Sequence, residues 1–155
     1  MDKKLIVIEG LDGGGKTTQL WLLKKDYPDF RFITFPNYQS PSGEIVTNYL
    51  EGKYKEQNDE VSAYTASCFY AVDRYTSYKT DWEKDYLSGM PVISVRYVSS
   101  NAIYQMTKLS KDKWNEYIEW LFDIEYNKFA LPKPTGIIFL DMPVDVSRKL
   151  LIKRY

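Results

Sequence analysis

Short apolar runs alternate along the chain with longer segments in which apolar residues recur at helical spacing. Leu5-Ile-Val-Ile8 is a short continuous apolar run followed by Glu9 and Gly10, which is typical of a strand buried on both faces of a parallel sheet. Three more strands are predicted over 31–35, 92–95 and 136–140. Helices are predicted over 16–26, 42–50, 60–87, 101–109, 113–129 and 144–154.

This alternation of strands and helices predicts βαβ units and an α/β fold. The sheet is expected to be mostly parallel, with helices on both faces in a three-layer arrangement. With 155 residues, the chain is expected to form a single domain over 1–155. Ligands of such folds bind at the carboxyl ends of the strands, so the segments after Ile8, Phe35, Val95 and Leu140 are the places to search.

Composition narrows the class of partner and the compartment. The 21 Lys and Arg residues balance the 21 Asp and Glu residues, which gives no global reason to expect nucleic-acid or membrane binding. Cys68 is the one cysteine, so no intrachain disulfide can form, and a cytoplasmic location is expected. The N-terminal apolar run is too short for a signal sequence or a membrane span.

A glycine-rich segment lies between the first predicted strand and the first predicted helix. Gly10, four further residues, Gly15, Lys16 and Thr17 match the spacing of a phosphate-binding loop. Consecutive glycines let backbone amides surround an anion at a helix N-terminus. Lys16 is expected to be exposed to the phosphates of ATP, and the Thr17 hydroxyl to bind Mg²⁺. The predicted ATP-binding residues are Gly10, Leu11, Asp12, Gly13, Gly14, Gly15, Lys16, Thr17 and Thr18.

Asp12 is unusual in such a loop, because a carboxylate repels bound phosphates unless its side chain points away. Pointing away, it could accept a hydrogen bond from a sugar hydroxyl. The alternative is a turn aspartate without a role in binding.

Three further segments carry unusual chemistry: 34–38, 69–74 and 96–105. Arg74 lies four residues after Tyr70, so the two share a helix face and could hold a base between ring and guanidinium. Equally, Tyr70 could be a core residue and Arg74 an ion-pair partner. Arg96 directly follows a buried strand, where its guanidinium could hold a phosphate.

Together these segments resemble the thymidylate kinase family, whose members are P-loop enzymes that transfer a phosphoryl group from ATP to dTMP. The resemblance is carried, in order, by EGLDGGGKTTQ, by FP followed by Tyr38, by FYAVDR and by RYVSSNAIYQ, and it runs from Leu5 to the end of the chain. It implies a P-loop NTPase fold, Mg²⁺-dependent formation of dTDP, and a homodimer.

The resemblance also implies roles by position. Lys16, Arg96 and Asp12 would act in catalysis, with Arg96 on the acceptor phosphate and Asp12 on the sugar 3′-hydroxyl. Tyr70 would stack on thymine, Arg74 would reach the base edge, and Tyr104 would crowd the 2′ position. The full set implied for dTMP is Asp12, Phe35, Pro36, Tyr38, Tyr70, Arg74, Arg96, Asn101, Tyr104 and Gln105.

Two departures from the family pattern leave alternatives open. Family members carry an aspartate where this chain has Val95, before Arg96, and they continue through a lid, a strand and a final helix beyond the position of Tyr155. The chain is therefore expected to be truncated before the lid, and its activity to be reduced. The alternatives are a kinase for another pyrimidine nucleotide or nucleoside, and a catalytically impaired nucleotide-binding form.

Overall fold

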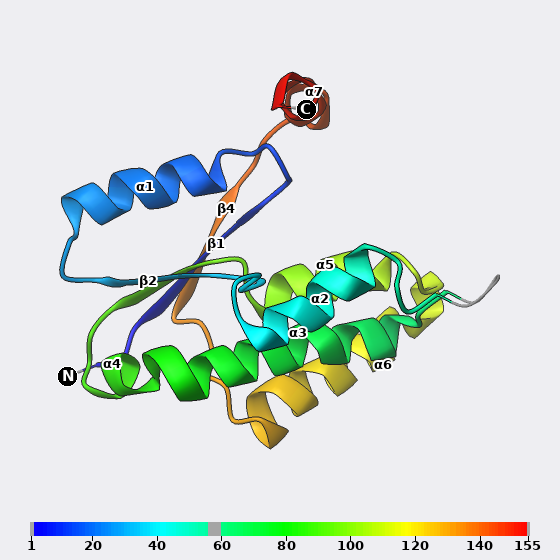
Figure 1. Cartoon of the computed structure of the whole chain (residues 1–155), viewed down its shortest axis with the longest axis horizontal. Coiled ribbons are helices and arrows are strands. Elements are labelled where there is room, and N and C mark those ends of the chain that lie inside the picture. Colours follow the sequence, from blue (N-terminus) through cyan, green and yellow to red (C-terminus); the bar gives the residue numbers. More distant parts are fainter. Residues whose placement is uncertain (1, 56–59, 155) are drawn as a thin grey trace. The chain divides into compact units, whose positions relative to one another are not determined.

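The computed structural model describes residues 2–55 and 60–154, and it confirms the α/β fold class. Four strands, β1 (Leu5–Gly10), β2 (Arg31–Thr34), β3 (Val92–Val95) and β4 (Gly136–Leu140), form one sheet in the order β2-β3-β1-β4 (Figure 1). Every pairing is parallel, with Leu5 opposite Val92 and Ile6 opposite Gly136. The sheet brings the ends of β1 and β3 to one edge, where the phosphate-binding loop and Arg96 follow.

The chain divides into two compact units. The sheet unit comprises Met1–Thr34, Lys84–Arg96 and Pro134–Tyr155. The helical unit comprises Phe35–Glu83 and Tyr97–Lys133.

In the sheet unit, α1 (Lys16–Asp26) packs along the sheet through one side of the helix (Figure 1). Leu20 joins Ile8, Ile93 and Val95 in a buried apolar cluster, and Leu23 packs against it. Two further helices follow in this unit's sequence, α4 (Glu83–Leu87) and α7 (Val144–Arg154). Burial of this cluster fixes α1, and with it the helix N-terminus that follows the glycine-rich loop.

β4 is an edge strand whose apolar side chains are only partly covered. Ile137, Ile138 and Phe139 are each more than half exposed, whereas β3 is buried along its whole length. Thr135 joins the start of β4 to β1, because its amide donates to Leu5 O at 2.7 Å and its Oγ1 accepts from Leu5 N at 3.1 Å.

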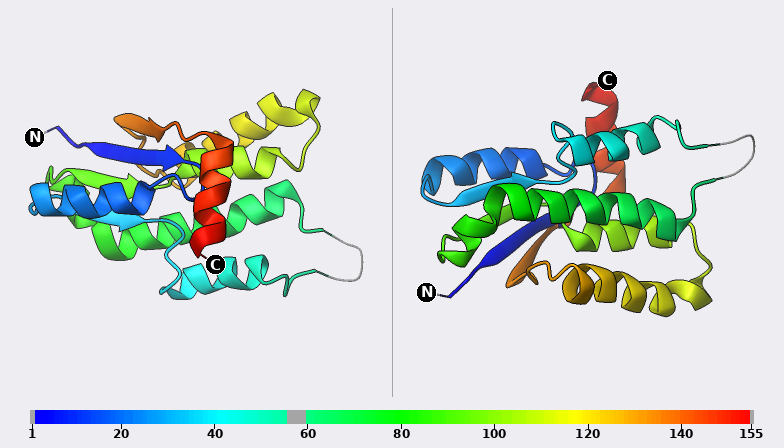
Figure 2. Two further views of the ribbon diagram at one scale, coloured as in Figure 1. Left: turned by 90° about the horizontal axis from the view of Figure 1, so that it is seen from above. Right: turned by 60° about the horizontal axis from the view of Figure 1, so that its bottom comes forward.

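The helical unit contains α2 (Pro41–Leu50), α3 (Ala63–Ser77), α5 (Val98–Met106) and α6 (Trp114–Phe122) (Figure 2). It also contains two π-helical segments, η1 (Tyr78–Trp82) and η3 (Asp123–Lys128), and a 3₁₀ turn, η2 (Lys111–Lys113). Serine side chains cap two of the helices: Ser40 Oγ accepts from Gly43 N at 3.0 Å, and Ser62 Oγ accepts from Thr65 N at 3.1 Å.

The helices over 16–26 and 144–154 begin and end as predicted, whereas other elements differ from their predicted bounds by a few residues. The helix predicted from 60 begins at Ala63, because Ser62 caps it. The helix predicted over 101–109 lies over Val98–Met106, since serines at 99 and 100 occupy the first turn instead of a loop. The helices predicted over 60–87 and 113–129 each contain a π-helical segment, which apolar periodicity does not reveal.

Candidate functional site

The phosphate-binding loop connects β1 to α1, and Lys16 closes it. Lys16 Nζ donates hydrogen bonds to Gly10 O and Leu11 O, both at 2.8 Å. The expectation that Lys16 is exposed is wrong: only 7% of it is accessible, because the ammonium folds back onto carbonyls of its own loop. Burial lowers the pKa of Lys16, and the positive charge of Arg96 lowers it further.

Glycine is required at several positions of the loop for steric reasons. Gly13 and Gly15 have φ values of 74° and 83°, in the left-handed region. A Cβ added at Gly10 would lie 2.8 Å from Leu140 O, and one at Gly14 would lie 2.8 Å from Leu11 O. A side chain at these positions would clash with neighbouring backbone or strain the loop. Glycine therefore allows the compact backbone path that an anion-binding loop needs.

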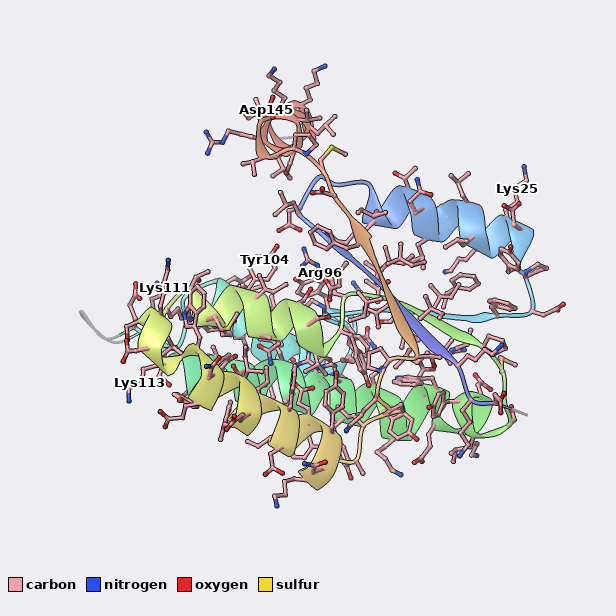
Figure 3. All side chains as sticks on the ribbon, turned by 180° about the vertical axis from the view of Figure 1, so that it is seen from behind. Lys25, Arg96, Tyr104, Lys111, Lys113 and Asp145 are labelled. Carbon is pink, nitrogen blue, oxygen red and sulfur yellow. The ribbon has the colours of Figure 1, made fainter. Side chains whose placement is uncertain are left out.

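Arg96 follows β3 and is the second cation of the sheet unit's site (Figure 3). Its amide donates to Ile8 O at 3.0 Å, which ties it to β1. Its φ of 63° is left-handed, an uncommon and costly conformation for a residue with a long side chain. Backbone strain of this kind concentrates at functional sites, and here it sets the direction in which the guanidinium leaves the sheet.

Asp12 forms an ion pair with Arg96 through its Oδ1 and the arginine Nη2, and the same oxygen lies 3.9 Å from Lys16 Nζ. The carboxylate thus faces the two cations of the site, and whether it points away from bound phosphates stays a prediction. The carboxylate compensates two positive charges that lie close together, which is the electrostatic role that a bound phosphate would also fill.

Arg74 is buried in the helical unit, with 2% of its surface accessible. Its Nε donates to Glu125 Oε2 at 2.6 Å and its Nη2 to Glu125 Oε1 at 2.5 Å. Burial alone lowers the pKa of Arg74, but the charge and hydrogen bonds of Glu125 outweigh burial and raise it. The ion-pair role that the sequence left open for Arg74 is thus present, and two of its nitrogens are engaged by Glu125.

Sequence reasoning missed Glu125, which is fully buried on η3. The one indication in the sequence was that Glu125 is an acidic residue at a position of the predicted helix where the pattern favours apolar residues. Asn101 belongs to the same cluster, because its Nδ2 donates to Ser67 O at 3.1 Å and to Glu125 Oε1 at 3.2 Å. The cluster links α3, α5 and η3 within the helical unit.

Two buried acceptors next to this cluster lack a partner among the residues that the structure describes. Asn101 Oδ1 and Gln105 Oε1 lie four residues apart on α5, and neither accepts a hydrogen bond there. A buried carbonyl without a donor costs free energy, so both are suited to accept from the N–H group of a ligand.

The aromatic candidates of the helical unit differ in exposure. Phe35 is buried and packs against Tyr97, with 5.9 Å between ring centroids, and Pro36 follows it through a cis peptide bond. Tyr70 is half-buried and meets Tyr49 edge-on at 6.1 Å. Tyr38 and Tyr104 are exposed (Tyr104 is labelled on α5 in Figure 3).

Val95 extends the buried strand, as its apolar side chain allows. It is 4% exposed and contacts the cluster of Ile8, Leu20 and Ile93 rather than polar groups.

Within residues 2–55 and 60–154, no group of three or more His, Cys, Asp or Glu side chains could hold a metal ion. The Thr17 hydroxyl, exposed in the first turn of α1, and the exposed Asp12 carboxylate are oxygen donors that Mg²⁺ favours.

No helix in the described part of the chain is both long and apolar enough to cross a membrane.

Comparison with known proteins places these features in one family. The thymidylate kinase family model matches residues 8–154. Thymidylate kinase from Mycobacterium tuberculosis is 30% identical over 152 residues, covering 92% of this chain and 68% of that protein. A probable thymidylate kinase from Staphylothermus marinus is 34% identical over 144 residues, covering 93% of this chain and 66% of that protein.

A solved structure gives the same result. Thymidylate kinase from Candida albicans superposes with a TM-score of 0.75 at 26% identity, covering 94% of this chain and 66% of that one. The chain thus spans about two thirds of the length of the relatives that it matches. The glycine-rich loop with Lys16, the arginine after β3 and these matches agree, and the chain belongs to the thymidylate kinase family.

Proposed function

We propose that this chain catalyses the Mg²⁺-dependent transfer of the γ-phosphoryl group of ATP to dTMP, with dTDP and ADP as products. The observation that carries this proposal is the closed, glycine-shaped loop around Lys16, with Arg96 beside it, in a chain of the thymidylate kinase family. The names of its relatives support dTMP as the acceptor.

The two cations of the sheet unit would neutralise the transferring phosphoryl group. Lys16 would leave its carbonyl partners for the phosphates of ATP, and Arg96 would exchange the Asp12 carboxylate for the phosphate of dTMP. Such transfer needs in-line positioning and positive charge rather than a covalent intermediate. Mg²⁺, held in part by Thr17, would supply further charge neutralisation to the phosphate oxygens.

Asp12 would then be released from Arg96 and become available to the sugar 3′-hydroxyl. In the structure the carboxylate is bound to the guanidinium through Oδ1. We propose that arrival of the acceptor phosphate at Arg96 frees Asp12, which links binding of the phosphate to recognition of the sugar.

The helical unit would recognise the base. Asn101 Oδ1 and Gln105 Oε1 are acceptors that match an N–H group such as N3–H of thymine. Tyr70 would stack on the ring, and Arg74, oriented by Glu125, would face an exocyclic oxygen of the base. Phe35, Pro36, Tyr38 and Tyr104 would complete the acceptor site, with Tyr104 beside the 2′ position.

An acceptor panel tests the proposed substrate. The values of kcat/KM for dTMP, dUMP, UMP and thymidine are compared at saturating ATP and Mg²⁺, and dTMP should give the highest value. This panel is informative because the Candida albicans relative is described as having broad substrate specificity. A higher kcat/KM for UMP or thymidine than for dTMP would contradict the assignment.

We also propose a cytoplasmic homodimer that binds neither nucleic acid nor membrane. The family resemblance supports the dimer, and the single cysteine supports a reducing compartment. The balanced charge supports the absence of nucleic-acid and membrane partners. Light scattering of the purified chain tests the dimer, and a monomeric mass would contradict it.

A further inference from the structure

Ser147 on α7 binds the phosphate-binding loop directly. Its hydroxyl donates a hydrogen bond to Asp12 O, across 135 positions of sequence, and Ser147 is only 5% exposed. Leu151, one turn further along α7, also lies close to the loop, since a Cβ added at Gly13 would lie 3.2 Å from its Cγ and 3.0 Å from Ser147 O. One side of α7 therefore packs against the loop (Asp145 marks this helix in Figure 3).

The carbonyl that Ser147 binds belongs to the central peptide of a β-turn. Gly14 N donates to Leu11 O at 3.0 Å, so Leu11 to Gly14 form the turn, with Asp12 and Gly13 as its central residues. Gly13 has a φ of 74°, whereas Asp12 is not among the residues with positive φ. This combination defines a type II turn.

A type II turn differs from a type I turn chiefly in the orientation of its central peptide. Glycine at the third position accepts either orientation, so Gly13 does not by itself select one. The hydrogen bond from Ser147 stabilises the orientation in which Asp12 O faces α7. Because a peptide is planar and trans, Gly13 N–H is then directed away from α7.

We infer that Ser147 is a positioning residue for nucleotide binding: through the Asp12–Gly13 peptide it holds the Gly13 amide in the orientation that receives a phosphate oxygen. The inference rests on the proposed function for the identity of the ligand. Without the Ser147 hydroxyl, the peptide would populate both orientations, and the apparent nucleotide affinity would fall in proportion to the competent fraction.

Three variants of the chain test this role, with ADP as the probe in a calorimetric titration. Ser147→Ala should weaken ADP binding about 3- to 10-fold, the effect of losing one hydrogen bond. Ser147→Thr retains the hydroxyl and should restore binding. Ser88→Ala is the matched control, because Ser88 Oγ also donates to a backbone carbonyl of the sheet unit, Asp85 O at 2.7 Å, and its loss should leave binding unchanged.

A second measurement reports on the peptide itself. The ¹⁵N–¹H resonance of Gly13 should shift in Ser147→Ala, while those of Gly52 and Gly89, which also have positive φ, should stay in place. Unchanged ADP affinity together with an unmoved Gly13 resonance would overturn the inference, as would a Thr variant as weak as the Ala variant. If the parent chain bound no ADP, the proposed function would fail, and the Gly13 resonance would still decide the role of Ser147.

Discussion

Arg96 shows how a single residue combines a strained backbone with a functional side chain. Its left-handed φ suits glycine, yet the position holds an arginine whose guanidinium engages Asp12. A glycine at this position would adopt the same backbone conformation without strain, but it would lack the positive charge. The need for a guanidinium at this point therefore explains the strain.

We expect Arg96→Gly to be more stable than Arg96→Ala by about 1 kcal/mol, because both variants lose the ion pair and only alanine keeps the left-handed strain. Both should lose phosphoryl transfer. Urea unfolding of the two variants provides the measurement, with the parent chain as reference. Equal stability of the two variants would show that the φ of Arg96 carries no cost.

The buried pair of Arg74 and Glu125 connects two elements, α3 and η3. Removing one member leaves the other charged and buried without its counter-ion, so Arg74→Met and Glu125→Met should each lower the free energy of unfolding by about 3–5 kcal/mol. The double variant Arg74→Met, Glu125→Met should be more stable than either single variant. Chemical unfolding of the parent chain, the two single variants and the double variant completes a double-mutant cycle. Additive effects of the two substitutions on the free energy of unfolding would contradict the pairing.

The strand β3 carries a second prediction at this scale. Val95→Asp places a carboxylate in the apolar cluster with Leu20 and should lower the free energy of unfolding by about 1–3 kcal/mol. Where the variant remains folded, it should raise kcat by up to about 10²-fold with little change in KM, since it supplies an orienting charge for Mg²⁺.

Val95→Asn is the matched control for this change, because it shares the polarity and shape of the aspartate without its charge. It should share the stability cost and show no gain in kcat. A parent chain as fast as the aspartate variant would remove the metal-orienting role from this position, and Asp141, directly after β4, would be examined next.

Much of the element pattern followed from the sequence, because apolar runs and glycines are local signals. The four strands, α1 and α7 were all predicted, and so was the glycine-shaped loop. The sequence did not predict that Arg74 pairs with Glu125, nor that Ser147 donates a hydrogen bond to Asp12. They join residues 51 and 135 positions apart, and nothing in the local sequence around Glu125 or Ser147 identifies its partner.

The same limit applies to Lys16 and Asp12. Spacing located both residues in the phosphate-binding loop, but the direction of each side chain depends on neighbours. Lys16 turns to the carbonyls of Gly10 and Leu11, and Asp12 turns to Arg96, which arrives from β3. Sequence spacing predicts which groups reach the site, and tertiary structure decides which of them pair.

At the scale of the whole chain, buried tyrosines make stability depend on alkaline pH. Burial raises the pKa of Tyr117 to about 12, from a usual value of 10.0. Burial also raises the pKa values of Tyr97 and Tyr126. The unfolded chain therefore loses these protons at lower pH than the folded chain does, so their contribution is complete below pH 10 and is lost as pH rises towards 12.

Stability against urea should accordingly fall between about pH 10 and pH 12, with tyrosinate absorbance rising as the helices unfold. Tyr117→Phe is the control, and its stability should depend less steeply on pH across this window. Its stability below pH 10 should be slightly lower, because the hydrogen bond with Ser67 Oγ at 2.6 Å is lost. A stability that stays constant over the window would contradict burial of these phenols.

The central claim is that this chain transfers a phosphoryl group from ATP to dTMP, and product analysis tests it most directly. The chain is incubated with ATP, dTMP and Mg²⁺, and the nucleotides are separated by ion-exchange chromatography, with Lys16→Ala in parallel. We predict that dTDP and ADP appear in equal amounts with the parent chain, and that Lys16→Ala forms neither while retaining its helical circular dichroism. Release of ADP without dTDP, or equal dTDP formation by Lys16→Ala, would contradict the account.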